Sequence, residues 1–251
     1  MPHVLEVAAA SGLTLAALTG AAAYAILNPR SQLCGPVLIA PESPSQIALT
    51  FDDGPNPSAT PQLLEVLARH KVRATFFLIG RYVLAEPALT REIAAAGHII
   101  GNHTMTHPWL PRHSARRIRE ELTACNRAIE DTLGLPVTLF RPPHGARRPA
   151  VLRIARELGL TTVQWNVIAG DWNPLPPQTL LTRVGRGIAR NRRHNRGTNL
   201  VLHDGGQHDP RAPRLPTVQA VELLLARLAA TSTFVTPPAW DSASSHIQVA
   251  Q

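Results

Sequence analysis

Apolar runs of strand type alternate with amphipathic helical patterns through most of this chain. Short apolar runs bounded by Gly, Pro or polar residues predict seven strands, at residues 46–51, 73–79, 98–102, 138–141, 161–166, 199–203 and 232–236. Apolar positions at helical spacing predict helices between them, at residues 58–70, 86–96, 114–133, 148–158, 178–191 and 216–230, the first of them capped by Ser58. Strands that alternate with helices favour a parallel α/β architecture, either an open sheet or a barrel.

An uncharged apolar stretch precedes this pattern. It runs from Val7 to Leu27, which is long enough for a bilayer span of about 20 residues and predicts a transmembrane or signal-anchor helix. An Ala-rich amphipathic helix packed on the domain is the alternative. We therefore divide the chain into an anchor segment, a Pro- and Gly-rich linker, one domain and a polar tail, at residues 1–30, 31–45, 46–236 and 237–251.

The charge balance narrows the kinds of partner. The formal net charge of +8 comes almost wholly from arginine, because Lys71 is the only lysine, and it favours an anionic neighbour such as a cell-wall polymer or a membrane surface. Six arginines between Arg183 and Arg196 form either a solvated helix face or a contact with anionic polymer or lipid phosphate. No nucleic-acid motif accompanies the arginines, so no nucleic-acid partner is expected, and no obligate protein partner is evident.

The two cysteines indicate no cofactor. Cys34 and Cys125 show neither a metal-site spacing nor a disulfide framework. We expect free thiols, with one disulfide between them as the alternative.

Two adjacent carboxylates, Asp52 and Asp53, stand at the end of the first predicted strand, directly before a Gly-Pro turn. Adjacent side chains on a strand point to opposite faces, so both acids can serve one site only if the strand gives way there. Two like charges are costly side by side unless they share a cation or a proton. A metal is therefore the first expectation, and a solvated turn is the alternative.

Further side chains that could take part in a reaction stand at the carboxyl ends of other predicted strands. His103 follows the third strand, Arg141 ends the fourth, Asp171 follows the fifth and His203 ends the sixth. In a parallel barrel the carboxyl ends of the strands converge on the active site. The periodicity therefore predicts one site at this rim.

His103 and His107 are four residues apart, a separation that places two imidazoles on one face of a helical turn and suits a single metal. With Asp53 they make two histidines and one acid, a set typical of catalytic Zn²⁺ or a related divalent ion. Asp52 would then act as base toward a metal-activated water. His203 would protonate a departing nitrogen.

Five motifs resemble, in order, those of the polysaccharide deacetylases, also called the NodB-homology family or carbohydrate esterase family 4. They are Thr50-Phe51-Asp52-Asp53-Gly54-Pro55, Gly101-Asn102-His103-Thr104-Met105-Thr106-His107-Pro108, Arg141-Pro142-Pro143-His144-Gly145, Asp171-Trp172 and Leu202-His203-Asp204. The resemblance covers residues 46–236 and implies a distorted (β/α)7 barrel, preceded here by an N-terminal hydrophobic helix. It also implies a divalent metal, most often Zn²⁺, with Co²⁺ or Ni²⁺ as alternatives.

The same resemblance implies a role for each site residue. Asp52 would be the general base, oriented by Arg141; His203 would be the general acid, polarised by Asp171; and the metal ligands would be Asp53, His103 and His107. Substrate contacts would come from Pro143, His144, Trp172 and Leu202, with Trp172 and Leu202 walling the pocket for the acetyl methyl group and the backbone N–H after Pro143 facing the oxyanion.

Two positions depart from the family pattern. His144 stands where Tyr is commoner, and its side chain leaves the substrate contacts at that position open. Ile168 stands where a further Asp is frequent, which leaves open whether Asp171 is the polarising carboxylate.

The function implied is that of a hydrolase of amide bonds, removing N-acetyl groups from a GlcNAc-containing polysaccharide such as peptidoglycan or chitooligosaccharide. A deacylase or deformylase of a lipid-linked sugar is the alternative, as is an O-acetyl xylan esterase; a third class is a catalytically silent carbohydrate-binding protein. We expect the domain to be membrane-anchored and to face the periplasm or the cell exterior. Only Arg30 flanks the apolar stretch, so the cytoplasmic face is the alternative.

Overall fold

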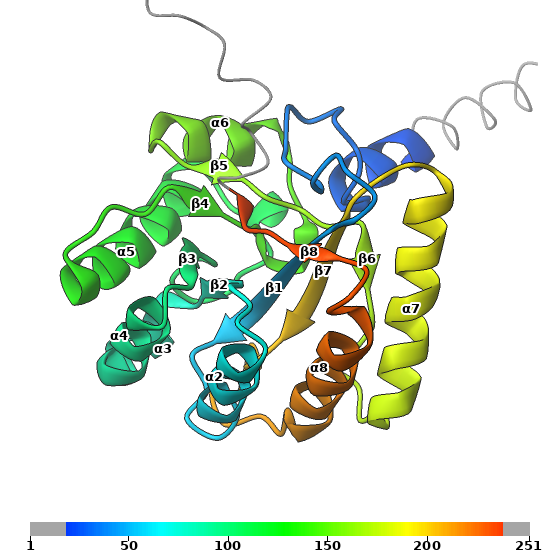
Figure 1. Ribbon diagram of the computed structural model, residues 1–251. Helices are drawn as coiled ribbons and strands as arrows, with labels where there is room; N and C mark the ends of the chain where they lie inside the picture. Colours follow the sequence, from blue (N-terminus) through cyan, green and yellow to red (C-terminus); the bar gives the residue numbers. More distant parts are fainter. Residues whose placement is uncertain (1–18, 238–251) are drawn as a thin grey trace, which may run out of the picture.

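Eight parallel strands form a single sheet in the computed structural model, which describes residues 19–237 (Figure 1). Their order across the sheet is β5-β4-β3-β2-β1-β7-β6, and β8 pairs with β1. The strands are β1 (Gln46–Gly54), β2 (Thr75–Leu78), β3 (Ile99–Asn102), β4 (Leu139–Phe140), β5 (Thr161–Thr162), β6 (Val167–Ile168), β7 (Thr198–His203) and β8 (Thr233–Phe234).

The two edge strands of this sheet, β5 and β6, are separated in sequence only by residues 163–166. Val163 N donates to Phe140 O of β4 at 2.8 Å. Asn166 N donates to Asn199 O of β7 at 3.2 Å, so the crossing segment is tied to both edges. The sheet is thereby curled into a distorted barrel, which confirms the fold expected from the motifs. The single strand predicted in this region is two short strands, because the chain spans the opening of the barrel instead of following one edge.

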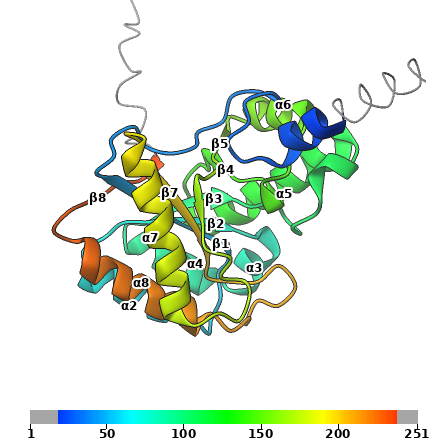
Figure 2. The same cartoon turned by 90° about the vertical axis from the view of Figure 1, so that its right-hand side faces the viewer.

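Helices surround this sheet (Figures 1 and 2). They are α2 (Thr60–Arg69), α3 (Gly80–Ala85), α4 (Pro87–Ala95), α5 (Ala115–Leu133), α6 (Pro149–Glu157), α7 (Pro177–Arg193) and α8 (Leu215–Leu228), with 3₁₀ turns η1 (Leu110–Arg112) and η2 (Pro143–Gly145). The six helices expected from periodicity are all present. Only α3 has no predicted counterpart, because its 6 residues are too few to show a helical repeat.

The first helix begins differently from the prediction. Its N-cap residue is Ala59, which has no side-chain cap, so the expected cap at Ser58 is wrong. Asn56 orders the turn instead, because its Oδ1 accepts a hydrogen bond from Ser58 N at 2.8 Å. At α5, by contrast, Ser114 is the N-cap, and its side chain accepts from Arg117 N at 3.2 Å.

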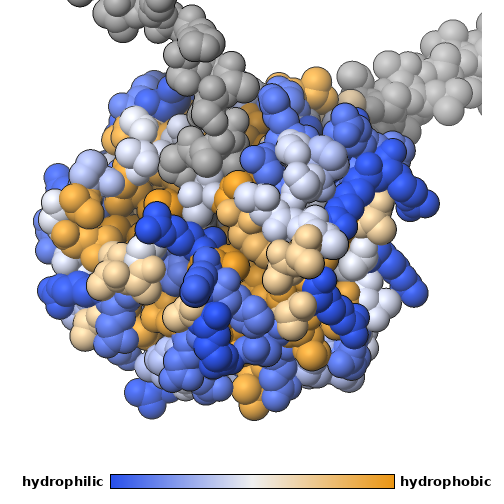
Figure 3. Space-filling model, viewed as in Figure 1, coloured by the Kyte–Doolittle hydropathy of each residue, from blue (hydrophilic) through white to orange (hydrophobic). Residues whose placement is uncertain are grey.

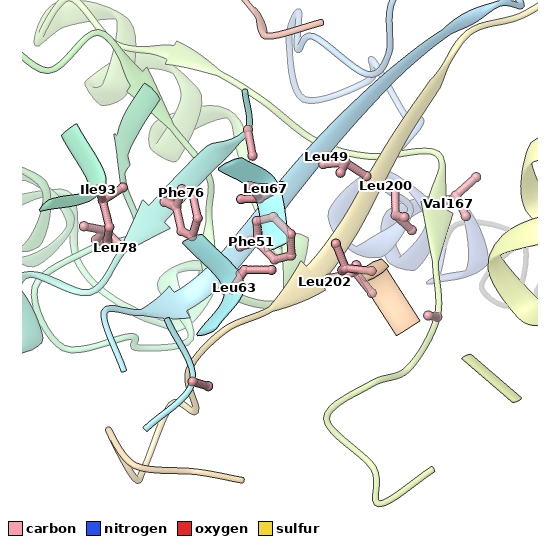
Figure 4. Packing of buried hydrophobic residues seen from close by; sticks show 14 of the residues in the cluster. Leu49, Phe51, Leu63, Leu67, Phe76, Leu78, Ile93, Val167, Leu200 and Leu202 are labelled. Atoms are coloured by element: carbon pink, nitrogen blue, oxygen red, sulfur yellow. The ribbon is translucent and has the colours of Figure 1, made fainter. Parts of the chain in front are cut away.

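The two faces of β1 carry different chemistry. Leu49 and Phe51 are buried beneath the outer helices, and Figure 4 shows Phe51 beside Leu63 of α2. Each such buried side chain contributes roughly 1.5–3 kcal/mol to folding. Thr50 and Asp52 alternate with them and face the barrel interior, so the strand that builds the core also delivers polar side chains to its carboxyl end.

Residues 25–38 contact the barrel before β1 begins, whereas residues 19–24 are exposed. Residues 19–27 are helical, and Leu38 pairs with Val163 at the barrel opening. The remainder of the predicted apolar helix, residues 7–18, lies outside the described residues, as do residues 238–251 of the predicted tail. Across residues 19–237, no helix is both long and apolar enough to cross a bilayer. The division into anchor, linker, domain and tail stays a prediction.

Arg147 fastens this segment to the barrel. Its side chain is fully buried, and Nη2 donates to Asn28 O at 2.8 Å and to Ser31 O at 2.7 Å. Nη1 donates to Gly145 O at 3.0 Å. A buried guanidinium is costly unless its donors are satisfied. Backbone carbonyls satisfy Nη1 and Nη2, whereas Nε has no partner among the described residues. Arg147 therefore joins residues 28–31 to the turn η2.

Arg147→Met is expected to lower the free energy of unfolding by at least about 2 kcal/mol, because the carbonyls of Asn28, Ser31 and Gly145 would lose their donor. Urea denaturation of the full chain measures the change. Arg148→Met is the matched control, since the partly buried Arg148 donates only to His113 O, at 2.8 Å, among the described residues. Its expected effect is below about 1 kcal/mol. Equal losses in the two variants would contradict the fastening role.

The arginines of α7 and the turn after it are mostly exposed, and none forms an ion pair with a residue in the range 19–237. In the view of Figure 3, hydrophilic side chains lie over the upper part of α7. Arg190 and Arg30 both donate to Asn166 O, at 3.4 and 3.0 Å. Whether this face binds an anionic polymer or only water stays a prediction. Cys34 and Cys125 are free thiols.

Candidate active site

An irregularity at the end of β1 brings two carboxylates to one cavity. The register of β1 against β2 shifts between Asp52 and Gly54, and Asp53 has a φ of 71°. This left-handed residue interrupts the alternation of the strand, so Asp52 and Asp53 line the same cavity. The expected break in the strand at the two acids is confirmed.

Glycines allow the backbone to pack closely around these acids. A Cβ at Gly54 would lie 2.3 Å from Asp204 Oδ2, and one at Gly205 would lie 1.9 Å from Asp53 O, so neither position admits another residue. Asp204 is buried, and its Oδ2 accepts from Thr60 Oγ1 at 2.5 Å. Burial raises the pKa of Asp204 to about 7, while the Thr60 hydrogen bond opposes the shift. Asp204 N also donates to Asp52 O at 3.2 Å, so Asp204 packs against the backbone of the two acids.

Arg141 is the partner of Asp52. It is fully buried, and its Nη1 donates to Asp52 Oδ1 at 2.8 Å and to Thr50 Oγ1 at 2.7 Å. The guanidinium lies over the ring of Phe77, 4.2 Å from its centroid. Burial lowers the pKa of Arg141, and Asp52 acts against that shift. Oδ1 of Asp52 is thereby held, whereas Oδ2 lies 3.9 Å from His103 Nε2.

His103 and His107 lie on a loop between β3 and η1. The helical turn expected from their spacing is wrong, because Thr104 and His107 have φ angles of 68° and 61°. Glu121 of α5 holds the loop by accepting from Thr106 N at 2.8 Å. The imidazoles still meet, with ring centroids 4.9 Å apart.

The ligand atoms of Asp53, His103 and His107 all lie within 4.8 Å of one another. His103 Nδ1 is 2.7 Å from Arg141 O, a carbonyl that can only accept, so Nε2 of the neutral ring is an unprotonated acceptor. This Nε2 lies 3.4 Å from Asp53 Oδ1, and His107 Nε2 lies 3.2 Å from the same oxygen, which has no hydrogen-bond partner among the described residues. Acceptors that face one another in this way fit a divalent cation between them.

The protonation states suit such a cation. Burial lowers the pKa of His107 to about 3, and His103 acts in the same direction, so the imidazole is neutral. For Asp53, burial acts upward, but the proximity of His103 and His107 outweighs it and lowers the pKa. A neutral imidazole and an ionised carboxylate are the forms that ligate metal.

Asp171 is the hydrogen-bond partner of His203. Its Oδ1 lies 2.9 Å from His203 Nδ1, while Oδ2 accepts from His203 N at 2.8 Å and from Thr217 Oγ1 at 3.0 Å. Burial acts to lower the pKa of His203, but Asp171 outweighs burial and the net shift raises it to about 9. Ile168 lies in the same cavity wall and offers no carboxylate. The imidazolium of His203 is therefore paired with Asp171.

These side chains line one cavity of about 360 Å³. It brings together seven of the residues expected from the motifs: Asp52, Asp53, His103, His107, His144, Trp172 and His203. Arg141 and Asp171 stand behind this lining as the partners of Asp52 and His203. The lining also includes residues that no motif singled out as site residues, namely Trp165, Val201, Gln207 and Arg214.

Two residues expected to contact substrate are not part of this lining. Leu202 is buried in the core on the outer face of β7, and Val201 lines the cavity in its place. The period of two along a strand accounts for this, because His203 and Val201 share one face and Leu202 has the other. Pro143 is buried, and the residue that reaches the cavity is His144.

Comparison with known proteins agrees with this geometry. Residues 40–163 match the family profile described as polysaccharide deacetylase. A chitooligosaccharide deacetylase of Azorhizobium caulinodans is 33% identical over 203 residues, which cover 78% of this chain and 94% of that protein. A peptidoglycan-N-acetylglucosamine deacetylase of Bacillus cereus is 35% identical over 190 residues, covering 75% and 84% of the two chains.

Solved structures show the same fold. The Bc1960 peptidoglycan N-acetylglucosamine deacetylase superposes with a TM-score of 0.71 at 30% identity, over 81% of this chain and 91% of that one. A pseudoenzyme of carbohydrate esterase family 4 from Bacillus anthracis superposes with a TM-score of 0.70 at 30% identity, over 80% of this chain and 66% of that one. With the barrel, the rim site and these relatives together, the chain belongs to the polysaccharide deacetylases, carbohydrate esterase family 4.

Proposed function

We propose that this protein is a metal-dependent hydrolase that removes N-acetyl groups from a GlcNAc-containing polysaccharide, either peptidoglycan or chitooligosaccharide. The observation that carries the proposal is the convergence of a metal-type donor set with a carboxylate and an imidazolium in one cavity. The relatives named above are deacetylases of these two substrates, which supports the same substrate class here.

Asp53, His103 and His107 would hold the metal, for which we propose Zn²⁺. When bound, it would supply Lewis-acid polarisation of the acetamide carbonyl and of the attacking water. Asp52 accepts the proton of that water at Oδ2, because Arg141 occupies Oδ1.

His203 completes the reaction at the opposite side of the cavity. Its Nε2 donates a proton to the sugar nitrogen as the bond between nitrogen and the acetyl carbon breaks, which yields acetate and a free amine. Trp172 stands edge-on to His203 with ring centroids 5.4 Å apart and would wall the site of the acetyl methyl group. The backbone N–H of His144 is our candidate donor to the oxyanion.

We also propose that the apolar stretch before residue 28 anchors the protein to a membrane, with the barrel facing the periplasm or the cell exterior. The support is the uncharged sequence from Val7 to Leu27 and the cell-wall substrate in the name of one relative. Fractionation of cells that express the full chain, followed by protease treatment of spheroplasts, tests both the anchoring and the side.

Asp171→Asn is expected to shift the alkaline limb of kcat/KM to lower pH. His203 must be protonated to act as acid, and its raised pKa of about 9 keeps the proton bound through neutral pH, with activity lost as pH rises through that value. Without the Asp171 charge, burial, which lowers the pKa of His203, is opposed only by the smaller contributions of Asp53 and Asp52, so the limb should move toward 6.5, the ordinary pKa of the group. An unchanged limb in pH–rate profiles would refute this pairing.

The deciding experiment is acetate release by the full chain from chitooligosaccharides, peptidoglycan and acetylated xylan, with and without a chelator and re-added Zn²⁺ or Co²⁺. The full chain is required because residues 28–31 supply partners to the buried Arg147. Chelator-sensitive acetate release from the amino sugars is the expected result. Metal binding without hydrolysis of any of the three would instead favour a lipid-linked sugar as substrate. Absence of both metal and hydrolysis would match a silent member, as one relative of this fold is a pseudoenzyme.

A further inference from the structure

One cation of the cavity wall has no role in the reaction described above. Arg214 lines the same cavity as Asp53 and His203, and only 9% of the residue is exposed. Among the described residues it forms no ion pair, which distinguishes it from the fully buried Arg141, the partner of Asp52.

The donors of Arg214 are mostly unused. Nε donates to Gly205 O at 2.7 Å, and this is the only side-chain hydrogen bond of Arg214 to the described part of the chain. A guanidinium has four further N–H donors, on Nη1 and Nη2. Neither nitrogen is fully enclosed by protein. Because Arg214 lines the cavity, we take these free donors to be accessible from it.

The position of Arg214 gives no benefit to its own helix. It is the N-cap residue of α8, whose 14 residues direct the positive end of the helix dipole toward it, and its side chain makes no capping hydrogen bond. A cation at this end of a helix is unfavourable, whereas an anion there is stabilised by both the helix and the guanidinium.

The loop that positions Arg214 is held in place from several sides. Tyr82 Oη donates to Gly206 O at 3.0 Å, and Arg81 donates to Gln207 O. Asn56 Nδ2 donates to Ala212 O at 2.9 Å. The guanidinium therefore faces the cavity from a fixed backbone, which is what recognition of a defined group requires.

We propose that Arg214 binds an anionic substituent of the substrate, a carboxylate or a phosphate, next to the acetamido group that is hydrolysed. The proposal rests on the proposed deacetylase function and adds a substrate class to it. An unpaired, nearly buried guanidinium that opens on to a reaction cavity matches such a planar, bidentate anion. A cavity of about 360 Å³ is near the lower end of ligand sites, so the anion belongs to the reacting sugar or its immediate neighbour.

Two kinds of substrate carry such a group, and matched pairs distinguish them. The first pair is a muramic-acid-containing peptidoglycan oligosaccharide and the same oligosaccharide with its lactyl carboxyl groups methyl-esterified. The second pair is N-acetylglucosamine 1-phosphate and its methyl glycoside. In each pair the neutral member lacks the anionic group, so the ratio of kcat/KM for the charged to the neutral member reports recognition of the anion.

Arg214→Met is expected to lower this ratio by about tenfold to a hundredfold for whichever pair the enzyme prefers, the range for a hydrogen bond to a charged group. Arg214→Lys keeps the charge without the fork and should recover part of the ratio. Arg211→Met is the matched control, because Arg211 lies on the same loop, is exposed and does not line the cavity. Its ratio should equal that of the wild type.

Equal losses of kcat/KM on charged and neutral substrates in Arg214→Met would overturn the proposal. Arg214 would then have only a structural role, through its hydrogen bond to Gly205 O. A wild-type enzyme that shows no preference within either pair would overturn it as well. Calorimetric binding of the same pairs is measured in parallel. Absence of acetate release from every substrate would count against the deacetylase function alone, whereas binding that depends on both the substrate charge and Arg214 would still support the anion site.

Discussion

Asp52→Asn is expected to lower kcat by about a hundredfold to ten-thousandfold while metal binding is retained. The structure separates the two aspartates of the motif. Asp52 Oδ1 is held by Arg141 and its Oδ2 stands outside the ligand group, whereas Asp53 Oδ1 lies between the two histidines. Asparagine keeps an oxygen for Arg141 but cannot accept the proton of the attacking water.

Acetate release and metal content measured on the same preparation test this division. Asp204→Asn is the matched control, assayed at pH 6, where its pKa of about 7 keeps the native Asp204 protonated and asparagine resembles it. We expect less than about a tenfold loss in this control. Loss of metal in Asp52→Asn equal to that in a ligand variant would contradict the separate roles of Asp52 and Asp53.

Much of this site could be predicted from the sequence because its parts are local. Asp52 and Asp53 follow an apolar run, and His203 ends another, so the rule that strand ends converge placed them together without long-range information. The same rule placed Arg141 at this rim, although its contact with Asp52 joins the ends of β4 and β1, which β3 and β2 separate in the sheet.

The wrong prediction of a helical turn at His103 and His107 reflects contacts between distant segments. The loop of His103 and His107 avoids a helical turn because Glu121 of α5 and the start of α3 bind its backbone, and neither contact has a signature in the spacing of the histidines. The position of Leu202 could have been predicted from the sequence, because its neighbour His203 determines which face of the strand lines the cavity.

Buried arginines were the hardest to interpret. In the sequence, Arg147 and Arg214 are two of many arginines in a basic chain, and composition favours solvated positions for all of them. Their roles depend on which backbone carbonyls reach them, and these belong to residues 28–31 for Arg147 and to Gly205 for Arg214. Only the folded chain distinguishes a buried cation from an exposed one.

His103→Ala is expected to abolish metal binding and to reduce activity to the level of the chelator-treated enzyme. His103 supplies one of three ligand atoms, and its Nδ1 bond to Arg141 O fixes the ring so that Nε2 faces Asp53. Losing this ligand leaves Asp53 and His107, too few for a stable site. Thermal unfolding with added Zn²⁺ provides a measurement that is independent of activity.

A ligand at a hundred times its dissociation constant stabilises the folded protein by about 2.7 kcal/mol, which for a chain of this size raises Tm by about 5–10 °C. Wild type should show this rise and His103→Ala should not. His144→Ala is the matched control, because its imidazole stands 4.7 Å from that of His107 without belonging to the ligand group, and it should keep the rise. A Zn²⁺-dependent rise that survives in His103→Ala and is lost in His144→Ala would move the metal to a different set of histidines, and with it the water that Asp52 is positioned to deprotonate.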